Sequence, residues 1–295
     1  MNIETSPLGD HAFGIRVRGI SQASLKDEDV RRLLRSLLDE YGLIFLEGIE
    51  PSHRLQVAVG EVFGTVKDYP TNQRGTVGNE VVPGIGEMVS GPENATVVEV
   101  AGVRLSGWMP WHFDQCYKEN PNIARVLRCG QRVPAGGTTG FLDGIELYGR
   151  LNPEIRSQIE TSSVTYTLNL TLDNLRFGVP TGFRLLRKAR AATWADSGAD
   201  LQTATHRAVR TTLTGRKVLQ VSPWMATGIA GRTDADALLE AVVQEILALS
   251  QSLAYFHTWQ LSDILVWDNL RMLHCSSGID PALRRVMYRT TISAN

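Results

Sequence analysis

Beyond Trp108 the chain is a series of short candidate strands, and this pattern constrains the fold more than any other feature. Only two segments with helical periodicity interrupt the strands, from Asp143 to about Gln158 and from Thr233 to about Ser250. Because strands and helices do not alternate there as in βαβ units, the pattern favours a barrel or a sandwich. We expect one mainly β domain over residues 1–295, with helices packed outside. The candidate strands are NIARVLRCGQRV, SSVTYTLNL, RKVLQVSPW, DILVWDN and RRVMYRTTI.

Two amphipathic helices are predicted in the N-terminal part. The segment from Ser24 to Gly42 places its apolar residues on one helical face, and Ser24 with Asp27 fits a capping box at its start. A second helix is predicted from about Pro51 to Phe63. Strands are predicted before and after the first helix, in FGIRVRGI and LIFLEG.

Residues 69–107 are rich in glycine, proline and asparagine and have little periodicity. Only Ala95 to Leu105 is predicted to be strand, with a hairpin turn around Ala101 and Gly102. Long irregular segments in compact domains are often lids or binding loops. We therefore expect residues 69–107, together with residues 168–192, to form lid or substrate-binding segments.

Charge and composition limit the classes of partner. The formal net charge is −1, so no overall positive field attracts nucleic acid or an anionic membrane. The N-terminus lacks the apolar core of a signal peptide, and no apolar run is long enough to span a membrane. Cys116, Cys129 and Cys275 lack zinc-type spacing and are expected to be reduced thiols. We expect a cytoplasmic protein that acts on a small molecule.

His112 and Asp114, in WHFDQ, are the first candidate functional residues. Residues i and i+2 of a strand point to the same side, so the two side chains would enter one space. Iron(II) in oxygenases favours two histidines and one carboxylate on one face of the metal. A second histidine must then come from elsewhere in the chain, and the candidates are His11, His53, His206, His257 and His274.

His274 is distinguished by two arginines that follow it. Arg285 and Arg289 come 11 and 15 residues later, in an alternating segment. Since they are four residues apart, both can face one side of the same strand. Buried arginines require anionic partners, because an unpaired buried charge is costly. The spacing therefore predicts a metal site next to an anion-binding interior.

Taken together, these motifs resemble the TauD/TfdA family (taurine dioxygenase and 2,4-D dioxygenase) of iron(II)- and 2-oxoglutarate-dependent oxygenases. The resemblance covers Phe13 to Ile292 and implies a double-stranded β-helix, or jelly-roll, barrel. It also implies an enzyme that oxidises, normally by hydroxylation, a C–H bond of a small organic molecule and releases succinate and CO2. The matching segments, in the family's order, are WHFD, PAGGTTGFLDGIELYGRL, TGRKVLQVSP, VWDNLRMLH and RRVMYRT.

The resemblance implies a role for each matching residue. His112, Asp114 and His274 would bind Fe(II), which O2 would also reach. Arg285 would bind the distal carboxylate of 2-oxoglutarate with Thr139 as a hydroxyl partner, and Arg289 would meet an anionic group of the primary substrate. Trp224 and Phe113 would line the substrate side, since Trp224 follows a barrel strand and Phe113 lies between the two ligands.

Two departures from the family pattern leave questions open. The family usually has Gly-Gly-Asp-Thr where this chain has Gly136-Gly137-Thr138-Thr139, so either threonine could bond the carboxylate. Phe113 stands where a small or polar residue is common, which would reshape the substrate side. The substrate itself is expected to be an anionic molecule or a secondary metabolite, because Arg104, Arg176 and Arg184 occur in the expected substrate segments.

Other function classes also fit the residues. A histidine–aspartate–histidine set suits zinc, which would make the protein a metal-dependent hydrolase or isomerase on a β-barrel. A non-catalytic ligand-binding barrel is a third class. The two arginines and the threonine favour the dioxygenase, because hydrolysis needs no dicarboxylate co-substrate. The family resemblance also suggests a homo-oligomer.

Overall fold

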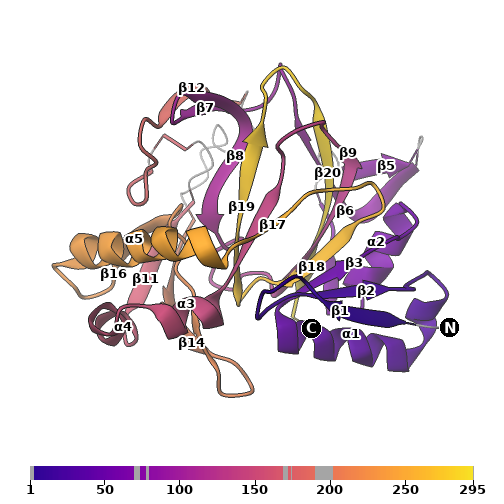
Figure 1. Cartoon of the computed structure of the whole chain (residues 1–295), viewed down its shortest axis with the longest axis horizontal. Helices are drawn as coiled ribbons and strands as arrows, with labels where there is room; N and C mark the ends of the chain where they lie inside the picture. Colours follow the sequence, from indigo (N-terminus) through magenta and orange to yellow (C-terminus); the bar gives the residue numbers. More distant parts are fainter. Residues whose placement is uncertain are drawn as a thin grey trace.

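A computed structural model describes residues 3–69, 74–77, 80–168, 172–173, 175–189 and 202–294. Two sheets form its centre, and helices pack on both sides of them (Figure 1). The predicted mainly β architecture with outer helices is therefore confirmed. None of the helices in these ranges is long and apolar enough to cross a membrane.

The larger sheet has nine strands, in the order β1-β2-β3-β18-β9-β20-β6-β5, with β4 paired to β20. Neighbouring strands in this sheet are mostly antiparallel, as in the central pairing of β9 with β18 and β20. The strands are β1 (Glu4–Pro7), β2 (Ile15–Arg18), β3 (Leu43–Leu46), β4 (Thr65–Lys67), β5 (Arg74–Val77), β6 (Glu80–Ser90), β9 (Ala124–Gln131), β18 (Ile264–Asp268) and β20 (Arg285–Ser293).

The second sheet has six strands, in the order β12-β7-β8-β19-β10-β17. Two small sheets, β13-β11-β16 and β14-β15, lie beside it. The strands of the six-stranded sheet are β7 (Val97–Val100), β8 (Val103–His112), β10 (Thr139–Asp143), β12 (Arg184–Arg187), β17 (Tyr255–His257) and β19 (Met272–Ile279). Those of the small sheets are β11 (Ser163–Thr167), β13 (Thr203–Arg207), β14 (Val209–Thr211), β15 (Lys217–Leu219) and β16 (Ala226–Ile229).

The helices divide between the two sides of the molecule (Figure 1). Apolar residues of α1 and α2 bury the outer face of the nine-stranded sheet, whereas α5 packs with the three-stranded sheet on the other side. Between the two main sheets lies a third apolar cluster, to which Leu127, Phe141 and Met287 belong. The helices are α1 (Glu28–Tyr41), α2 (His53–Gly60), α3 (Gly144–Arg150), α4 (Pro153–Ile159) and α5 (Ala235–Leu253), with a 3₁₀ turn at Ser24–Lys26.

The N-terminal strand and helix predictions need two corrections. The strand β2, the helix α1 and the strand β3 form a βαβ unit, because β2 and β3 pair in parallel. In addition, Ser24 and Asp27 do not form a capping box. The helix α1 begins at Glu28, and the Asp27 side chain caps it by accepting a hydrogen bond from the Asp29 amide. Ser24 belongs to the preceding 3₁₀ turn.

Two further boundaries differ from the sequence prediction. The segment expected to form one helix from Asp143 to Gln158 forms two helices, α3 and α4. Pro153 begins α4, because a proline inside a helix would remove a backbone hydrogen bond and clash with the preceding turn. The segment expected to be irregular contains β6, an 11-residue strand. Its glycines allow close packing: a Cβ on Gly84 would lie 2.5 Å from Val66, and one on Gly86 would lie 2.9 Å from the Tyr69 ring. The predicted β7–β8 hairpin is present.

Candidate metal centre and co-substrate site

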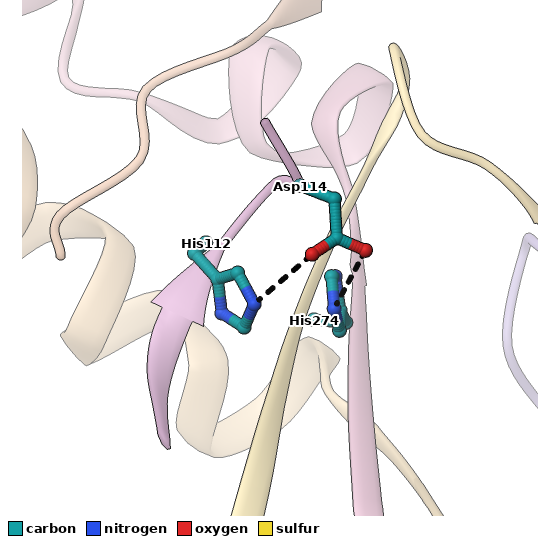
Figure 2. Close-up of side chains that lie close together, drawn as sticks. All are labelled: His112, Asp114 and His274. Atoms are coloured by element: carbon teal, nitrogen blue, oxygen red, sulfur yellow. Dashed lines mark ion pairs between the residues drawn. The ribbon is translucent and has the colours of Figure 1, made fainter. Parts of the chain in front are cut away.

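The two main sheet strands β8 and β19 bring the predicted ligands together. They pair antiparallel, with His112 directly opposite His274, and the ring centroids of the two histidines are 4.1 Å apart. Asp114 follows two residues after His112, just beyond the end of β8. Its carboxylate faces both imidazoles in Figure 2, with one oxygen toward each ring. Residues 160 positions apart in the chain thus meet at one point.

The spacing of the three side chains fits a bound ion better than direct hydrogen bonds. His112 Nε2 is 3.8 Å from Asp114 Oδ1, and His274 Nε2 is 3.7 Å from Asp114 Oδ2 (Figure 2). Both distances are too long for hydrogen bonds. One potential ligand atom from each residue lies within 4.8 Å of the others. Two imidazole nitrogens and one carboxylate oxygen on one side match the donor set of non-haem iron(II).

The hydrogen bond of His112 leaves its Nε2, the nitrogen that faces Asp114, available to bind a metal. The Nδ1 of His112 is 2.8 Å from the Pro110 carbonyl oxygen. A carbonyl can only accept, so Nδ1 carries the proton, and the Nε2 lone pair of the neutral ring is free to bind a metal. Burial lowers the pKa of His112 and that of His274, the latter to about 3, which keeps both rings neutral at physiological pH.

Two polar side chains hold Asp114. The guanidinium of Arg125, on β9, contacts its carboxylate, with Nε 2.6 Å from Oδ2. The Asn269 side chain accepts a hydrogen bond from the Asp114 amide at 2.9 Å and donates one to the Asp114 carbonyl oxygen at 3.0 Å. Burial alone would raise the pKa of Asp114, but the charge of Arg125, followed by His274 and His112, lowers it to about 2. The carboxyl group is therefore ionised.

Arg285 supplies an unsatisfied buried charge between the sheets. It is the first residue of β20, and its Nη2 is buried with no hydrogen-bond partner among the described residues. Burial lowers its pKa to about 10, so the group stays charged near neutrality. Gly137 lies against it, since a Cβ there would be 3.2 Å from Arg285 Nε. An uncompensated guanidinium of this kind requires an anionic ligand.

Thr139 and Thr138 differ in their surroundings. Thr139, at the start of β10, is buried, and its hydroxyl accepts a hydrogen bond from the indole of Trp259. Thr138 is only half-buried, and its amide donates to the hydroxyl of Ser277. Successive strand residues point to opposite faces, so only one of the two can face the space between the sheets. Trp259 belongs to the cluster that fills this space, which favours Thr139.

Arg289 lies on the same face of β20 as Arg285. The register of β20 with β6 is regular from Arg285 to Arg289, so residues four apart keep the same orientation. The Arg289 guanidinium lies over the Tyr69 ring, with its Cζ 5.1 Å from the centroid. Its charge also contributes to the low pKa of Asp114. Arg289 is thus placed near the three predicted ligands.

The two predicted substrate residues have different environments. Trp224 packs edge-on against His112, with the ring centroids 4.9 Å apart, and its indole nitrogen is buried without a hydrogen-bond partner in the described part of the chain. Phe113 is only 1% exposed and lies in the core beside Tyr166 and His206. Phe113 follows the last residue of β8, and its ring packs edge-on against these two residues. This position gives Phe113 a packing role, and no contact supports its predicted role in substrate binding.

The arginines expected in the outer substrate pocket have acidic partners on the protein. Arg184 pairs with Glu99, whose carboxylate also lies 4.0 Å from Arg104. Arg176 pairs with Asp236 at 2.7 Å. These three residues therefore do not indicate an anionic substrate. Of the residues in the predicted segment 168–192, positions 169–171, 174 and 190–192 lie outside the described residues.

Sequence reasoning missed Arg125 and Asn269, which position Asp114, and Trp259, which contacts Thr139. A signal existed for Arg125: NIARVLRCG is an apolar strand interrupted by two arginines, Arg125 and Arg128, whose odd spacing sends them to opposite faces. Arg128 contacts His53, the first residue of α2, on the outer face of the nine-stranded sheet. His257, another candidate for the second ligand histidine, packs against the aromatic rings of Phe45 and Trp259.

The chain is similar in sequence to known enzymes over nearly its whole length. Pentalenolactone F synthase of Streptomyces arenae is 30% identical over 97% of this chain and 92% of the relative. The (S)-phenoxypropionate/alpha-ketoglutarate-dioxygenase of Sphingobium herbicidovorans is 25% identical over 99% of this chain and 95% of the relative.

Solved structures share the fold. A taurine dioxygenase from Burkholderia xenovorans superposes with a TM-score of 0.71 at 22% identity, covering 99% of this chain and 91% of that one. AAD-2, solved in complex with Mn(II) and N-oxalylglycine, gives a TM-score of 0.72 at 21% identity, covering 100% and 98%. The predicted jelly-roll fold is thereby confirmed.

The family model described as "Taurine catabolism dioxygenase TauD, TfdA family" matches residues 4–291. This match confirms the resemblance expected from the motifs, and it supports the dioxygenase over the hydrolase and the non-catalytic barrel. The chain belongs to the TauD/TfdA family of dioxygenases.

Proposed function

We propose that the protein is an Fe(II)- and 2-oxoglutarate-dependent dioxygenase that hydroxylates a C–H bond of a small organic molecule and releases succinate and CO2. The observation that carries this proposal is the conjunction of two features. A buried histidine–aspartate–histidine face offers three ligand atoms within 4.8 Å of one another. Arg285, whose buried Nη2 has no hydrogen-bond partner among the described residues, supplies the charge that a dicarboxylate co-substrate needs.

In the proposed site, His112, Asp114 and His274 hold the iron. When bound, the iron together with 2-oxoglutarate and O2 supplies the oxidising power for the C–H bond. The protein's own residues bind the co-substrate and orient it. Arg285 pairs with the distal carboxylate of the co-substrate, and the Thr139 hydroxyl donates to the same group. Trp224, edge-on against His112, closes one side of the metal site and limits the entry of water.

For the primary substrate, we propose a molecule that carries a carboxylate or a similar anion. Arg289 supports this assignment, because it is largely buried and faces the same space as Arg285. The printed names of two relatives point in the same direction. One acts on (S)-phenoxypropionate and another on 2,4-dichlorophenoxyacetate, and both compounds are carboxylates. A substrate anion at Arg289 would place a neighbouring C–H bond near the metal.

The remaining features of the proposal concern the whole chain. Residues 1–295 act as one catalytic domain, and residues 69–107 and 168–192 border the substrate entrance. A cytoplasmic setting suits the three cysteines, all of which are free and buried. The partner is a small molecule, without nucleic acid or membrane, and the enzyme assembles as a homo-oligomer.

A substrate screen tests the proposed function. The purified protein is incubated with Fe(II), 2-oxoglutarate and O2, and succinate is measured with and without each member of a panel of aryloxyalkanoates, sulfonates and lactones. We expect at least one anionic compound to stimulate iron-dependent succinate formation, and the Asp114→Ala variant to lose it. A protein that forms no succinate under any condition, and that does not bind 2-oxoglutarate, would contradict the proposal.

A further inference from the structure

A buried hydrogen bond connects Trp259 to the proposed co-substrate site. The indole Nε1 of Trp259 lies 3.0 Å from Oγ1 of Thr139. Both side chains are buried between the two sheets, at 5% and 4% exposure. Neither residue is one of the proposed metal ligands. Thr139 is the residue proposed to bond the distal carboxylate of the co-substrate, so the bond lies on the co-substrate side of the site.

The chemistry of the two groups fixes the direction of this hydrogen bond. An indole N–H can only donate, whereas a hydroxyl has one proton and two lone pairs. Thr139 must therefore accept from Trp259, and its own proton stays available for another partner. Among the described residues the Thr139 hydroxyl has no other hydrogen bond. An acceptor, such as a carboxylate oxygen, would complete the pattern.

Such an acceptor would also meet Arg285. Gly137 precedes Thr139 by two residues and lies against the Arg285 guanidinium, whose Nη2 has no partner within the described ranges. The Thr139 proton and the arginine charge therefore border the same part of the inter-sheet space. A carboxylate there would accept from both groups, and each of these bonds is strengthened by the negative charge of the acceptor.

Trp259 is itself held in place by a buried polar group. His257 packs edge-on against the indole, with the ring centroids 4.7 Å apart. Its Nε2 lies 3.0 Å from Asp263 Oδ2, and the Tyr255 hydroxyl lies 2.8 Å from its Nδ1. The carboxylate accepts from Nε2, and Nδ1 faces the Tyr255 hydroxyl. These contacts hold the ring of His257, and His257 in turn fixes the orientation of the indole.

We infer that Trp259 is a positioning residue that makes the Thr139 hydroxyl a dedicated hydrogen-bond donor to the distal carboxylate of the co-substrate. This inference rests on the proposed function. Without the indole N–H, the hydroxyl can rotate and donate elsewhere, so the free protein no longer has the donor oriented before the ligand arrives. Trp259 acts through Thr139 and contacts neither the metal ligands nor the reacting atoms.

Binding of N-oxalylglycine to the Mn(II)-loaded protein tests the inference without turnover. Trp259→Phe removes the N–H and keeps an aromatic ring of similar shape. We expect about 3- to 10-fold weaker binding in this variant by titration calorimetry, and about 10-fold or more in Thr139→Val. The double variant should bind no more weakly than Thr139→Val alone, because both changes remove the same hydrogen bond from Thr139 to the carboxylate. Thr139→Ser, which keeps the hydroxyl, should bind like the wild type.

Pyruvate serves as the internal control, because it has the same 2-oxo acid group but no distal carboxylate. Its affinity for the Mn(II) protein should be the same in the wild type and in Trp259→Phe. Unchanged N-oxalylglycine binding in Trp259→Phe, equal losses for both ligands, or additive losses in the double variant would each overturn the inference. If the wild-type protein binds neither Mn(II) nor N-oxalylglycine, the proposed function itself fails, so the two failures are distinguishable.

Discussion

The guanidinium of Arg125 lies against the carboxylate of Asp114, with Nε 2.6 Å from Oδ2. The arginine side chain is 7% exposed and the aspartate side chain 22%, so the pair is largely shielded from water. The contact uses one carboxylate oxygen and leaves Oδ1 facing His112. Arg125 therefore holds a proposed metal ligand in place and keeps it ionised, so it bears on both the fold and the metal site.

Arg125 should support both the fold of the metal-free protein and the binding of the ion. Arg125→Met should lower the free energy of unfolding of the metal-free protein by about 3 kcal/mol, since a buried carboxylate loses its partner. The same change should weaken Mn(II) binding by about tenfold or more, because the proposed ligand Asp114 loses the group that orients it and keeps it ionised. Denaturant unfolding and metal titration measure the two effects.

Arg128→Met is the matched control for Arg125→Met. Arg128 lies on the same strand but on the opposite face, where it contacts His53 and Gln56. Its loss should destabilise the protein without changing Mn(II) affinity. Unchanged or stronger Mn(II) binding in Arg125→Met would show that Arg125 does not position Asp114 for the metal.

The second prediction concerns His112 as a metal ligand. His112→Ala should weaken Mn(II) binding on the order of 100-fold or more, since losing even an outer partner of a ligand costs about 10- to 100-fold. Calorimetric titration of the metal-free protein measures this. His206→Gln is the control, because His206 bonds the Lys118 carbonyl oxygen and lies outside the ligand set. Equal affinity in His112→Ala and His206→Gln would exclude His112 as a ligand.

The third prediction concerns Arg285 and the co-substrate. Truncation of a buried arginine that pairs with a carboxylate costs about 2–5 kcal/mol, part of which comes from the stranded partner charge. Arg285→Ala should therefore raise the apparent constant for 2-oxoglutarate on the order of 30-fold or more. Steady-state succinate formation at varied 2-oxoglutarate concentration gives this constant. An unchanged constant in an active variant would remove Arg285 from the co-substrate site.

The fourth prediction separates Arg289 from Arg285. Arg289→Lys keeps the charge but loses the planar fork that binds an anion through two hydrogen bonds. We expect weaker binding of the anionic primary substrate identified in the screen, on the order of tenfold, and little change for 2-oxoglutarate. Two titrations of each protein make the comparison. Equal losses for both ligands would place Arg289 at the co-substrate, and no loss for either would leave it structural.

The fifth prediction is a pH dependence of stability that arises at His53. Burial, followed by the charge of Arg128, lowers the pKa of His53 from 6.5 to about 4. Between these values the unfolded chain binds a proton that the folded protein does not. The free energy of unfolding should therefore fall as the pH drops from about 6.5 to 4, by up to about 1.4 kcal/mol per pH unit from this group.

His53→Gln isolates this contribution. The variant keeps an acceptor for Arg128 but has no group that titrates, while the lowered pKa values of His112 and His274 remain in both proteins. Unfolding curves between pH 4 and pH 7 should show a shallower acid-side slope for the variant. Parallel slopes would mean that His53 does not titrate differently in the folded and unfolded states.

Only part of the candidate metal centre could be predicted from local spacing. Arg285 and Arg289 lie on one strand, so their shared face follows from the period of two. The strand expected through His112 and Asp114 ends at His112, and Asp114 lies in the turn that follows. The pairing that sets His112 opposite His274 depends on the register of β8 with β19, which no local pattern encodes. The positioning residues Arg125 and Asn269 come from other strands and turns, so they could not be assigned to Asp114 from the sequence.

The errors in the fold have physical causes. Gly84 and Gly86 resembled loop residues in the sequence, yet they lie in β6, where the side chains of Val66 and Tyr69 leave no space for a Cβ. The βαβ unit at the N-terminus was missed because a parallel pairing of β2 with β3 has no separate sequence signal in such short strands. Phe113 illustrates the reverse case, since its position between two proposed ligands suggested the site, although its ring is buried in the core against Tyr166.

The most direct test of the central claim is the absorption spectrum of the anaerobic protein with one equivalent of Fe(II) and then 2-oxoglutarate. If the histidine–aspartate–histidine face holds iron and Arg285 anchors the co-substrate, the wild type should develop a weak visible charge-transfer band that saturates at one iron per chain. His274→Ala should not develop it. A band of equal intensity in His274→Ala, or no band in a wild-type protein that binds both ligands, would contradict the assignment of this site.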